Sequence, residues 1–324
     1  GIYRQCLRED PEHAGAWHLL GVVLHSRNDL PAAQEHIEKA LSLCDSKAAY
    51  WTNYGAVLKD AGRFADAKQA FERALSIRNT YADAWSNLGL MQSELGQLDD
   101  AEKSIRYALS LEPRHADAMR HLAVVYLERG EHEEALRLCR DATAIAPETA
   151  EVYRVEGRIL VAVKRLEEAA SAFGEAIARD PNASDSHLDQ GFAYADLEEI
   201  DKARESFRLA GDLRPELSMW QLRHLCLCPT IFGTAAEISD YRADLERQLD
   251  TALADPPAFD WRNAPRDGFT PSFQLSHHGV GNRRLKEKYA GLFAHHFPQT
   301  RPKSLQHKRI RVGFTCTRDH EGGF

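Results

Sequence analysis

Large and small apolar positions alternate along the first two thirds of the chain at one fixed interval. Large residues recur every 34 positions, at Trp17, Trp51, Trp85, Met119, Tyr153 and His187. Small residues follow four positions later, at Gly21, Gly55, Gly89, Ala123, Gly157 and Gly191. Each unit also carries an alanine at one further register, at Ala33, Ala67, Ala101, Ala135, Ala169 and Ala203. Such a period predicts an array of identical supersecondary units, each packed against its neighbours.

These residues fit the tetratricopeptide (TPR) pattern, W-x2-L-G-x2-Y…A-x3-F…P, at its own period. Six complete copies are found, each with a helix A and a helix B. Small residues at the glycine and alanine positions let the two helices approach closely, and large residues fill the gaps between neighbouring pairs. We therefore predict an all-α fold. It is a TPR α-solenoid, a right-handed superhelix of helix-turn-helix repeats, followed by linker helices and a short terminal strand.

The segments that flank the repeats have patterns of their own. Tyr3, Cys6 and Pro11 lie at the register of a helix B, so we expect the array to have been cut before its preceding helix A. After the sixth repeat the chain is too apolar for a polar cap, so we expect that repeat to pack on the segment after it. Near the end, apolar and polar residues alternate with the two-residue period of a strand. We expect a partial repeat with helix B only in 1–13 and six repeats in 14–217. Capping and linker helices follow in 218–254, with one helix over 235–254. A Pro-rich crossing in 255–308 contains one helix, 282–296, and a strand and loop end the chain in 309–324.

Composition narrows the class of function. The net charge of −8 argues against a dedicated nucleic-acid binder. No apolar run approaches the roughly 20 residues of a membrane span, and the N-terminus has no signal-peptide h-region. The six cysteines lack a framework spacing, which favours free thiols in a reducing compartment, so we expect a cytoplasmic protein with no membrane partner. The adjacent histidines at 277–278 and 295–296 would point about 100° apart on a helix, so we predict no metal site.

The C-terminal hundred residues resemble the O-GlcNAc transferase and SPINDLY-like family of protein O-glycosyltransferases. Three stretches carry the resemblance: LCPTIFGTAAEISDYRADLERQLDTAL looks like the family's pre-catalytic helix, FTPSFQLSHHGVGNRRLKEKYAGLF like the segment before its catalytic region, and RIRVGF like its first catalytic strand. The resemblance implies a TPR superhelix that leads into a GT-B region of two Rossmann-like domains, with 309–324 as the first strand and loop of that region.

The same resemblance has consequences for chemistry. It implies a nucleotide sugar, UDP-GlcNAc or GDP-fucose, for the longer parent protein and no cofactor in this chain, which alone should lack transferase activity. It assigns a catalytic role to His320, although the loop TCTRDHEGGF departs from the family's D-F-x-x-H-P pattern in the position of the histidine and in lacking the Phe and Pro.

The inner face of a TPR superhelix is lined by its A helices, and polar residues lie there in rows. Asn53 and Asn87 occupy one row, and His121 and Asp189 follow at equivalent places. In the resembled family an asparagine ladder at this position grips the backbone of an extended substrate, since a carboxamide offers both a donor and an acceptor to a peptide group. The alternative is an asparagine that bonds within the array. The other candidates for this peptide-binding face are His18, Lys59, Arg120, Arg154 and Arg158.

Two repeats depart from the pattern in a way that affects stability. Glu156 and Gln190 replace the leucine of W-x2-L-G in repeats five and six. A polar group at this position costs stability unless it is hydrogen-bonded. Either the two residues pair with neighbours such as Arg158, which we expect, or the two repeats are locally looser.

Two functions fit the sequence. The first is a TPR array that recruits substrate proteins or extended peptides for a protein O-glycosyltransferase, which would transfer a sugar to Ser/Thr hydroxyls. The second is a non-enzymatic TPR scaffold for protein–protein interaction. A homo-oligomer formed through the exposed ends of the solenoid is compatible with either.

Overall fold

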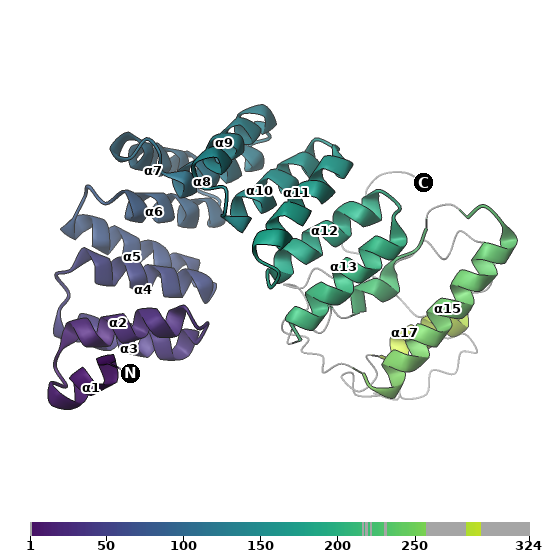
Figure 1. Cartoon of the computed structure of the whole chain (residues 1–324), viewed down its shortest axis with the longest axis horizontal. Coiled ribbons are helices and arrows are strands. Elements are labelled where there is room, and N and C mark those ends of the chain that lie inside the picture. Colours follow the sequence, from purple (N-terminus) through teal and green to yellow (C-terminus); the bar gives the residue numbers. More distant parts are fainter. Residues whose placement is uncertain are drawn as a thin grey trace, which may run out of the picture.

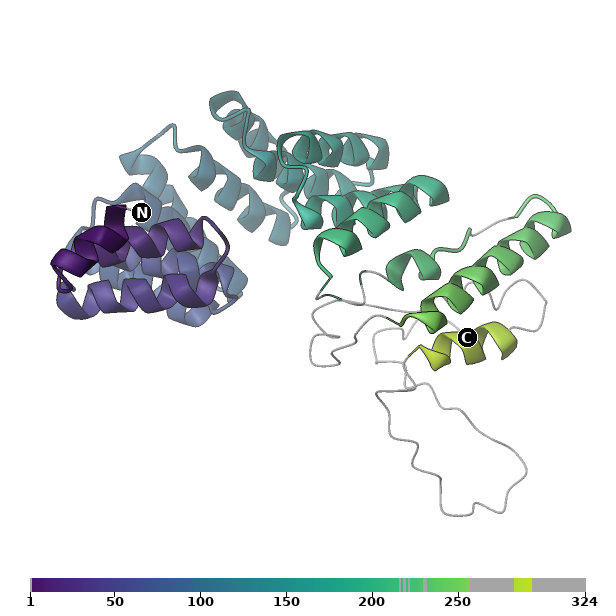
Figure 2. The ribbon, with the colours of Figure 1, turned by 60° about the horizontal axis from the view of Figure 1, so that its bottom comes forward.

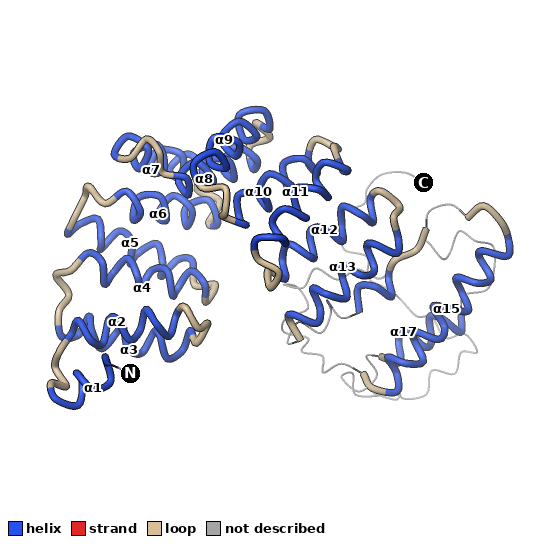
Figure 3. The backbone as a smooth tube through the Cα atoms, in the orientation of Figure 1, coloured by secondary structure: helices blue, strands red, loops and turns tan. Residues whose placement is uncertain are grey.

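The computed structural model describes residues 2–215, 217, 220, 222–229, 232–256 and 283–292. Within these residues every regular element is a helix. The first two thirds form an α-solenoid of paired antiparallel helices, stacked in chain order along a curved array (Figure 1). Figure 3 shows the short connections that join one helix to the next.

Each repeat contributes one helix A and one helix B. The A helices are α2 (Ala14–His25), α4 (Ala48–Asp60), α6 (Ala82–Glu94), α8 (Ala116–Glu128), α10 (Ala150–Ala162) and α12 (Ser184–Asp196). The B helices are α3 (Leu30–Leu43), α5 (Phe64–Ile77), α7 (Leu98–Leu111), α9 (His132–Ile145), α11 (Leu166–Arg179) and α13 (Ile200–Leu213). Before them, α1 (Ile2–Glu9) packs on α2, where its Tyr3 and Leu7 contact the cluster around Trp17. The predicted all-α fold of helix-turn-helix repeats is confirmed.

The turn between helices A and B has the same backbone conformation in every repeat. One residue in each turn has a φ near +60° to +77°, the left-handed region that favours glycine. Three repeats place glycine there, and three place a residue with a side chain: Gly62, Gly96 and Gly130, and Asn28, Lys164 and Glu198. A single left-handed residue reverses the chain within a few positions, so helix B folds back along its own helix A.

The core lies between helices A and B, where small residues face large ones. Ile37, Phe71 and Ile105 are fully buried on their B helices. Opposite them stand Gly21, Gly55 and Gly89, whose missing side chains leave the space that the large residues fill. The helix pair of each repeat is therefore held by close contact at one register, as the sequence indicates.

The last repeat is covered by the chain that comes after it. Leu217 and Trp220 are buried against Ala210, and Leu227 is buried against Phe207. The expectation that the sixth repeat packs on the segment after it is confirmed, and its apolar end is covered by a non-repeat segment.

Beyond this cover lies a small helical unit. It consists of the 3₁₀ helix η1 (Arg223–Cys226), α15 (Ala235–Ala254) and α17 (Arg283–Gly291), and Figure 2 shows α17 running alongside α15. Leucines of these helices and of the residues next to them form one apolar cluster. Lys288 on α17 joins α15 through Glu246 at 2.8 Å and Asp250 at 2.6 Å. Helix α15 has the bounds expected from the sequence, and α17 lies within the expected 282–296, of which residues 282 and 293–296 are outside the described ranges.

Two polar replacements in the core are accommodated differently. Gln190 donates to the Ala170 carbonyl at 3.2 Å and accepts from the Ser206 hydroxyl at 3.3 Å. Glu156 does not pair with Arg158, which forms an ion pair with Glu128 at 3.8 Å. Burial instead raises the pKa of Glu156, opposed by the charges of nearby arginines. The expected pairing with Arg158 is thus corrected, because that guanidinium reaches back to the preceding repeat.

Several expectations fall on residues outside the described ranges. These are the terminal strand and loop 309–324, His320, the histidine pairs at 277–278 and 295–296, and most of the crossing 255–308. Among the residues that are described, no helix is both long and apolar enough to cross a membrane.

Candidate peptide-binding surface

The array has an inner face made by the A helices. Successive A helices contact one another from α2 and α4 through α10 and α12, whereas successive B helices make no comparable contacts within the described part of the chain. Because the A helices are closer together, the stack curves with the A helices on its inside. This inner face carries the residues that the sequence proposes for peptide binding.

Pairs of polar residues join neighbouring repeats across this face. His18 bonds to Asn53 at 2.8 Å, Ser86 to His121 at 2.8 Å, and Arg154 to Asp189 at 3.1 Å. The two partners are 35 positions apart in each case, one more than the repeat length. A residue on one A helix therefore contacts the residue that lies one register position further along on the next A helix. The row of His18, Ser86 and Arg154 thus bonds to the row of Asn53, His121 and Asp189 at every second junction between repeats.

The two asparagines use their amide donors inside the array. The Asn53 Nδ2 lies against His18 Nε2, and the Asn87 Nδ2 donates to the Asp83 carbonyl at 2.8 Å. Both side chains are partly exposed. Among the described residues neither Oδ1 has a hydrogen-bond partner, so each asparagine keeps an acceptor for a ligand.

The two candidate histidines lie beneath the surface of the inner face. His18 is 8% exposed and stacks on the Tyr50 ring at 4.2 Å between centroids, and His121 is 3% exposed. Each ring lies at the contact between two successive A helices, where His18 bonds to Asn53 and His121 bonds to Ser86. Their rings connect the repeats, and they offer little surface to a ligand.

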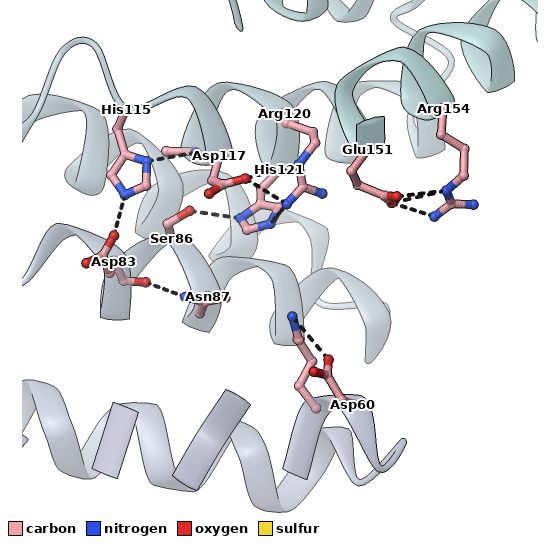
Figure 4. Close-up of polar contacts among 12 residues, drawn as sticks. Asp60, Asp83, Ser86, Asn87, His115, Asp117, Arg120, His121, Glu151 and Arg154 are labelled. Atoms are coloured by element: carbon pink, nitrogen blue, oxygen red, sulfur yellow. Dashed lines mark hydrogen bonds and ion pairs between the residues drawn. The ribbon is translucent and has the colours of Figure 1, made fainter. Parts of the chain in front are cut away.

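His121 is neutral, and its surroundings explain why. Its Nε2 accepts from the Arg120 guanidinium at 2.8 Å, so the proton is assigned to Nδ1, which donates to Ser86 (Figure 4). Complete burial and the positive charges of Arg120 and Lys59 hold its pKa well below the usual value of 6.5, and the nearby His115 acts in the same direction. Protonation would put two cations side by side and remove an acceptor from Arg120.

The low pKa of His121 predicts a loss of stability in mild acid. The unfolded chain takes up a proton near pH 6.5 while the folded chain does not, so the free energy of unfolding falls as pH drops below that value. His121→Asn places at this register the residue found at Asn53 and Asn87, which does not titrate. Between pH 7.5 and 5.5, the wild type should lose about 1.4 kcal/mol more than the variant in urea unfolding. Equal losses would contradict a buried neutral ring. His115, whose pKa is raised mainly by its bond to Asp83, is present in both proteins and cancels.

The basic residues of the inner face have carboxylate partners. Lys59 pairs with Asp60 at 3.3 Å and Arg120 with Asp117 at 3.0 Å. Arg154 lies between Glu151 and Asp189, with its side chain 20% exposed. These pairs balance the charge locally, so the face is not built to concentrate acidic ligands.

Two histidine–carboxylate hydrogen bonds at the same junctions were not foreseen. His25 bonds to Asp60 at 2.7 Å, and His115 to Asp83 at 3.0 Å. The His25–Asp60 spacing is 35 residues, as for His18 and Asn53, so a search for complementary residues at that offset would have found it. Among the described residues no group of three or more His, Cys, Asp or Glu side chains is arranged to hold a metal.

The paired helices and the inner face define the class of the protein, a TPR array. The family model described as the C-terminal domain of cilia and flagella-associated protein 70 matches residues 1–191. This match spans more than half of the chain, and the chain belongs to that family.

Solved structures agree on the fold. The chain is similar to the APC/C hetero-tetramer Cut9–Hcn1, with 17% identity and a TM-score of 0.61, over 69% of this chain and 45% of that one. It is also similar to TTC0263, a thermophilic TPR protein of Thermus thermophilus, with 21% identity and a TM-score of 0.51, over 55% of this chain and 96% of that one. The matched region is thus less than half of the first chain. No curated protein matches the sequence.

Proposed function

We propose that the chain binds extended polypeptide segments along the inner face of its TPR array. The observation that carries this proposal is the pair of acceptors at one register on successive A helices, the Oδ1 atoms of Asn53 and Asn87. Backbone N–H groups of an extended peptide are donors whatever the side chains, so such contacts supply affinity with little sequence preference. The exposed parts of Lys59 and Arg158, whose side chains are 31% and 38% accessible, border the same face.

The test removes the two acceptors together. Asn53→Ala/Asn87→Ala should weaken the binding of several unrelated extended peptides alike, about tenfold, since each hydrogen bond contributes roughly 0.5–1.5 kcal/mol. Fluorescence anisotropy with labelled peptides measures the dissociation constants. Asn182→Ala, in an exposed loop between α11 and α12, is the matched control and should bind as the wild type does. Unchanged affinity in the double variant, with an unchanged melting temperature, would eliminate this surface.

A finer proposal concerns what the bound polypeptide is for. We propose that the array delivers Ser/Thr substrates to a protein O-glycosyltransferase of the O-GlcNAc transferase type, with UDP-GlcNAc or GDP-fucose as the donor. Its support is the likeness of three stretches within residues 227–314 to the segments that lead into that family's catalytic region, including a helix at 235–254. Remote binding energy of this kind orients the acceptor hydroxyl for attack.

Sugar transfer tests the finer proposal separately. The product of the complete reading frame, incubated with either labelled nucleotide sugar and a protein acceptor, should transfer label to Ser/Thr, whereas this chain alone should not. Peptide binding without transfer from either donor would leave the array as a non-enzymatic scaffold for protein–protein interaction, which is the alternative function.

A further inference from the structure

Part of the inner face is both uncharged and open to a ligand in repeats one to three. It combines the asparagine register with the register three positions further along helix A, one turn away on the same side of the helix. Both registers are exposed or partly exposed in α2, α4 and α6 (Figure 1), where they hold Leu19 and Val22, Asn53 and Ala56, and Asn87 and Leu90. We call these six residues the open stripe. In repeats four and five, three of the four residues at these registers are buried, namely His121, Val124 and Val155, so the open stripe ends at α6.

The open stripe places an aliphatic surface beside each free acceptor. Leu90 lies one turn from Asn87, and Ala56 lies one turn from Asn53; within the described ranges both asparagines have an Oδ1 without a partner. In repeat one the asparagine register itself holds Leu19, which is 42% exposed. A single exposed leucine is ordinary on a protein surface, but here aliphatic groups follow one face through three successive repeats. A peptide whose backbone reaches the acceptors therefore lays side chains against an apolar surface.

One carboxylate continues this face of α6 beyond Leu90. Glu94 comes four residues later, on the same side of the helix and about 6 Å further along its axis. It is exposed, and in the described part of the chain it has neither a hydrogen bond nor an ion pair. The equivalent carboxylate of repeat four, Glu128, pairs at 3.8 Å with Arg158, thirty positions later. Thirty positions after Glu94 the chain has Val124, which offers no charge.

The charge along the three open A helices is negative. Helices α2, α4 and α6 together contain one lysine and no arginine against three Asp and Glu residues, a net charge of −2 with histidine neutral. The lysine, Lys59, already pairs with Asp60 at 3.3 Å, and Asp83 bonds to His115 at 3.0 Å. Glu94 is thus the carboxylate that remains for a ligand, and a basic residue is complementary to it.

We propose that repeats one to three select polypeptide segments in which aliphatic and basic residues alternate on one side of an extended strand. This inference rests on the peptide binding proposed above and adds the class of peptide. Every second side chain of an extended strand points the same way, so such a strand presents both kinds of residue to the A helices. Its aliphatic side chains pack on Leu19 and Leu90 while its backbone bonds to the asparagines. A lysine or arginine next to the aliphatic residue on that side reaches Glu94.

The probes are three nine-residue peptides with the same N-terminal fluorescein label and an amidated C-terminus. The Leu/Lys peptide is Ser-Leu-Ser-Lys-Ser-Leu-Ser-Lys-Ser. Serine replaces both leucines in the Ser/Lys peptide, and glutamate replaces both lysines in the Leu/Glu peptide. Fluorescence anisotropy should show the Leu/Lys peptide binding at least fivefold more tightly than either of the others.

Variants of the open stripe test where this preference arises. Leu19→Asn and Leu90→Ala place there the residues that the chain has at the same registers in repeat two. Together they should bring the affinity for the Leu/Lys peptide to within twofold of that for the Ser/Lys peptide. Leu19→Asn alone, at an exposed position, should weaken the Leu/Lys peptide at least threefold at an unchanged melting temperature. Ile77→Asn is the control, because Ile77 is 37% exposed on the B helix α5, and it should bind as the wild type does.

The variant Glu94→Gln tests the basic half of the preference. It should weaken both lysine-containing peptides at least threefold and should not weaken the Leu/Glu peptide. Equal weakening of all three peptides would overturn the assignment of the basic residue to Glu94.

The same measurements separate this inference from the function on which it rests. If Asn53→Ala/Asn87→Ala weakens all three peptides alike but the wild type binds them equally, the inner face binds polypeptides and the selectivity is overturned. A leucine preference that persists in Leu19→Asn/Leu90→Ala overturns the open stripe as its source. Binding of none of the three peptides overturns both proposals.

Discussion

Adding one methyl group at Gly89 should destabilise the protein by about 2 kcal/mol, the cost of overpacking a close-packed core. A Cβ at this position would lie 2.3 Å from the Ile105 Cγ1 and 3.0 Å from the Ala101 carbonyl oxygen. Ile105 is fully buried, and its β-branched side chain has one strongly preferred rotamer in a helix, so it cannot turn aside. The better helix propensity of alanine, worth up to about 1 kcal/mol, offsets only part of the strain.

Repeat four already contains the compensated version of this contact. There the small residue is Ala123 rather than glycine, and the residue facing it is Cys139 rather than isoleucine or phenylalanine. Both are fully buried. In repeat four the larger residue on helix A is thus matched by a smaller residue on helix B.

A pair of double-mutant cycles tests this coupling. Gly89→Ala should be rescued by Ile105→Cys, and Cys139→Ile should be rescued by Ala123→Gly, each rescue recovering more than about 1 kcal/mol relative to additivity. Urea unfolding of the four single and two double variants gives the free energies. Additive effects in both cycles would show that the helices move apart to accept the added methyl group, against the close packing that the structure has.

The repeat period made most of the architecture predictable. It determines which residues face each other within a repeat, so the helix pairs and the buried series at Ile37 and Phe71 follow from spacing. The helix at 235–254 lies outside the repeats and follows from its own helical spacing of apolar residues. Contacts between repeats follow less directly. They depend on how far one A helix is shifted against the next, and that shift produces the offset of 35 residues that joins His18 to Asn53.

The candidate site was accordingly only partly predictable. The sequence identifies the inner face and its rows of polar residues, but it does not say which of them the next helix covers. His18 and His121 are covered, while Asn53 and Asn87 remain partly exposed.

Removing the Arg154 side chain should destabilise repeats five and six by about 2 kcal/mol, less than the loss of one partner from a fully buried ion pair, because both partners are partly exposed. Its guanidinium lies 2.5 Å from Glu151 and 3.1 Å from Asp189, and the latter contact crosses to the next repeat. The Asp189 side chain is only 25% exposed, and burial raises its pKa despite the arginine. In Arg154→Leu this carboxylate would remain buried without its counter-charge.

The deficit of Arg154→Leu should depend on pH and on Asp189. Asp189 is an acid whose pKa is raised in the folded state, so its ionisation lowers the free energy of unfolding as pH rises through its titration. The loss of unfolding free energy in Arg154→Leu should therefore shrink as pH falls from 7 toward 5.

Arg154→Leu/Asp189→Leu places at both positions the residue that this chain uses at the same registers elsewhere, Leu188 and Leu19. It should recover more than half of the lost stability, since replacing a whole buried pair by apolar residues is often neutral. Hydrogen exchange in α12 and α13 locates the effect. A pH-independent deficit that the second substitution does not reduce would mean that Arg154 acts through the packing of its aliphatic stem, and that the repeats are joined here by apolar contact rather than by charge.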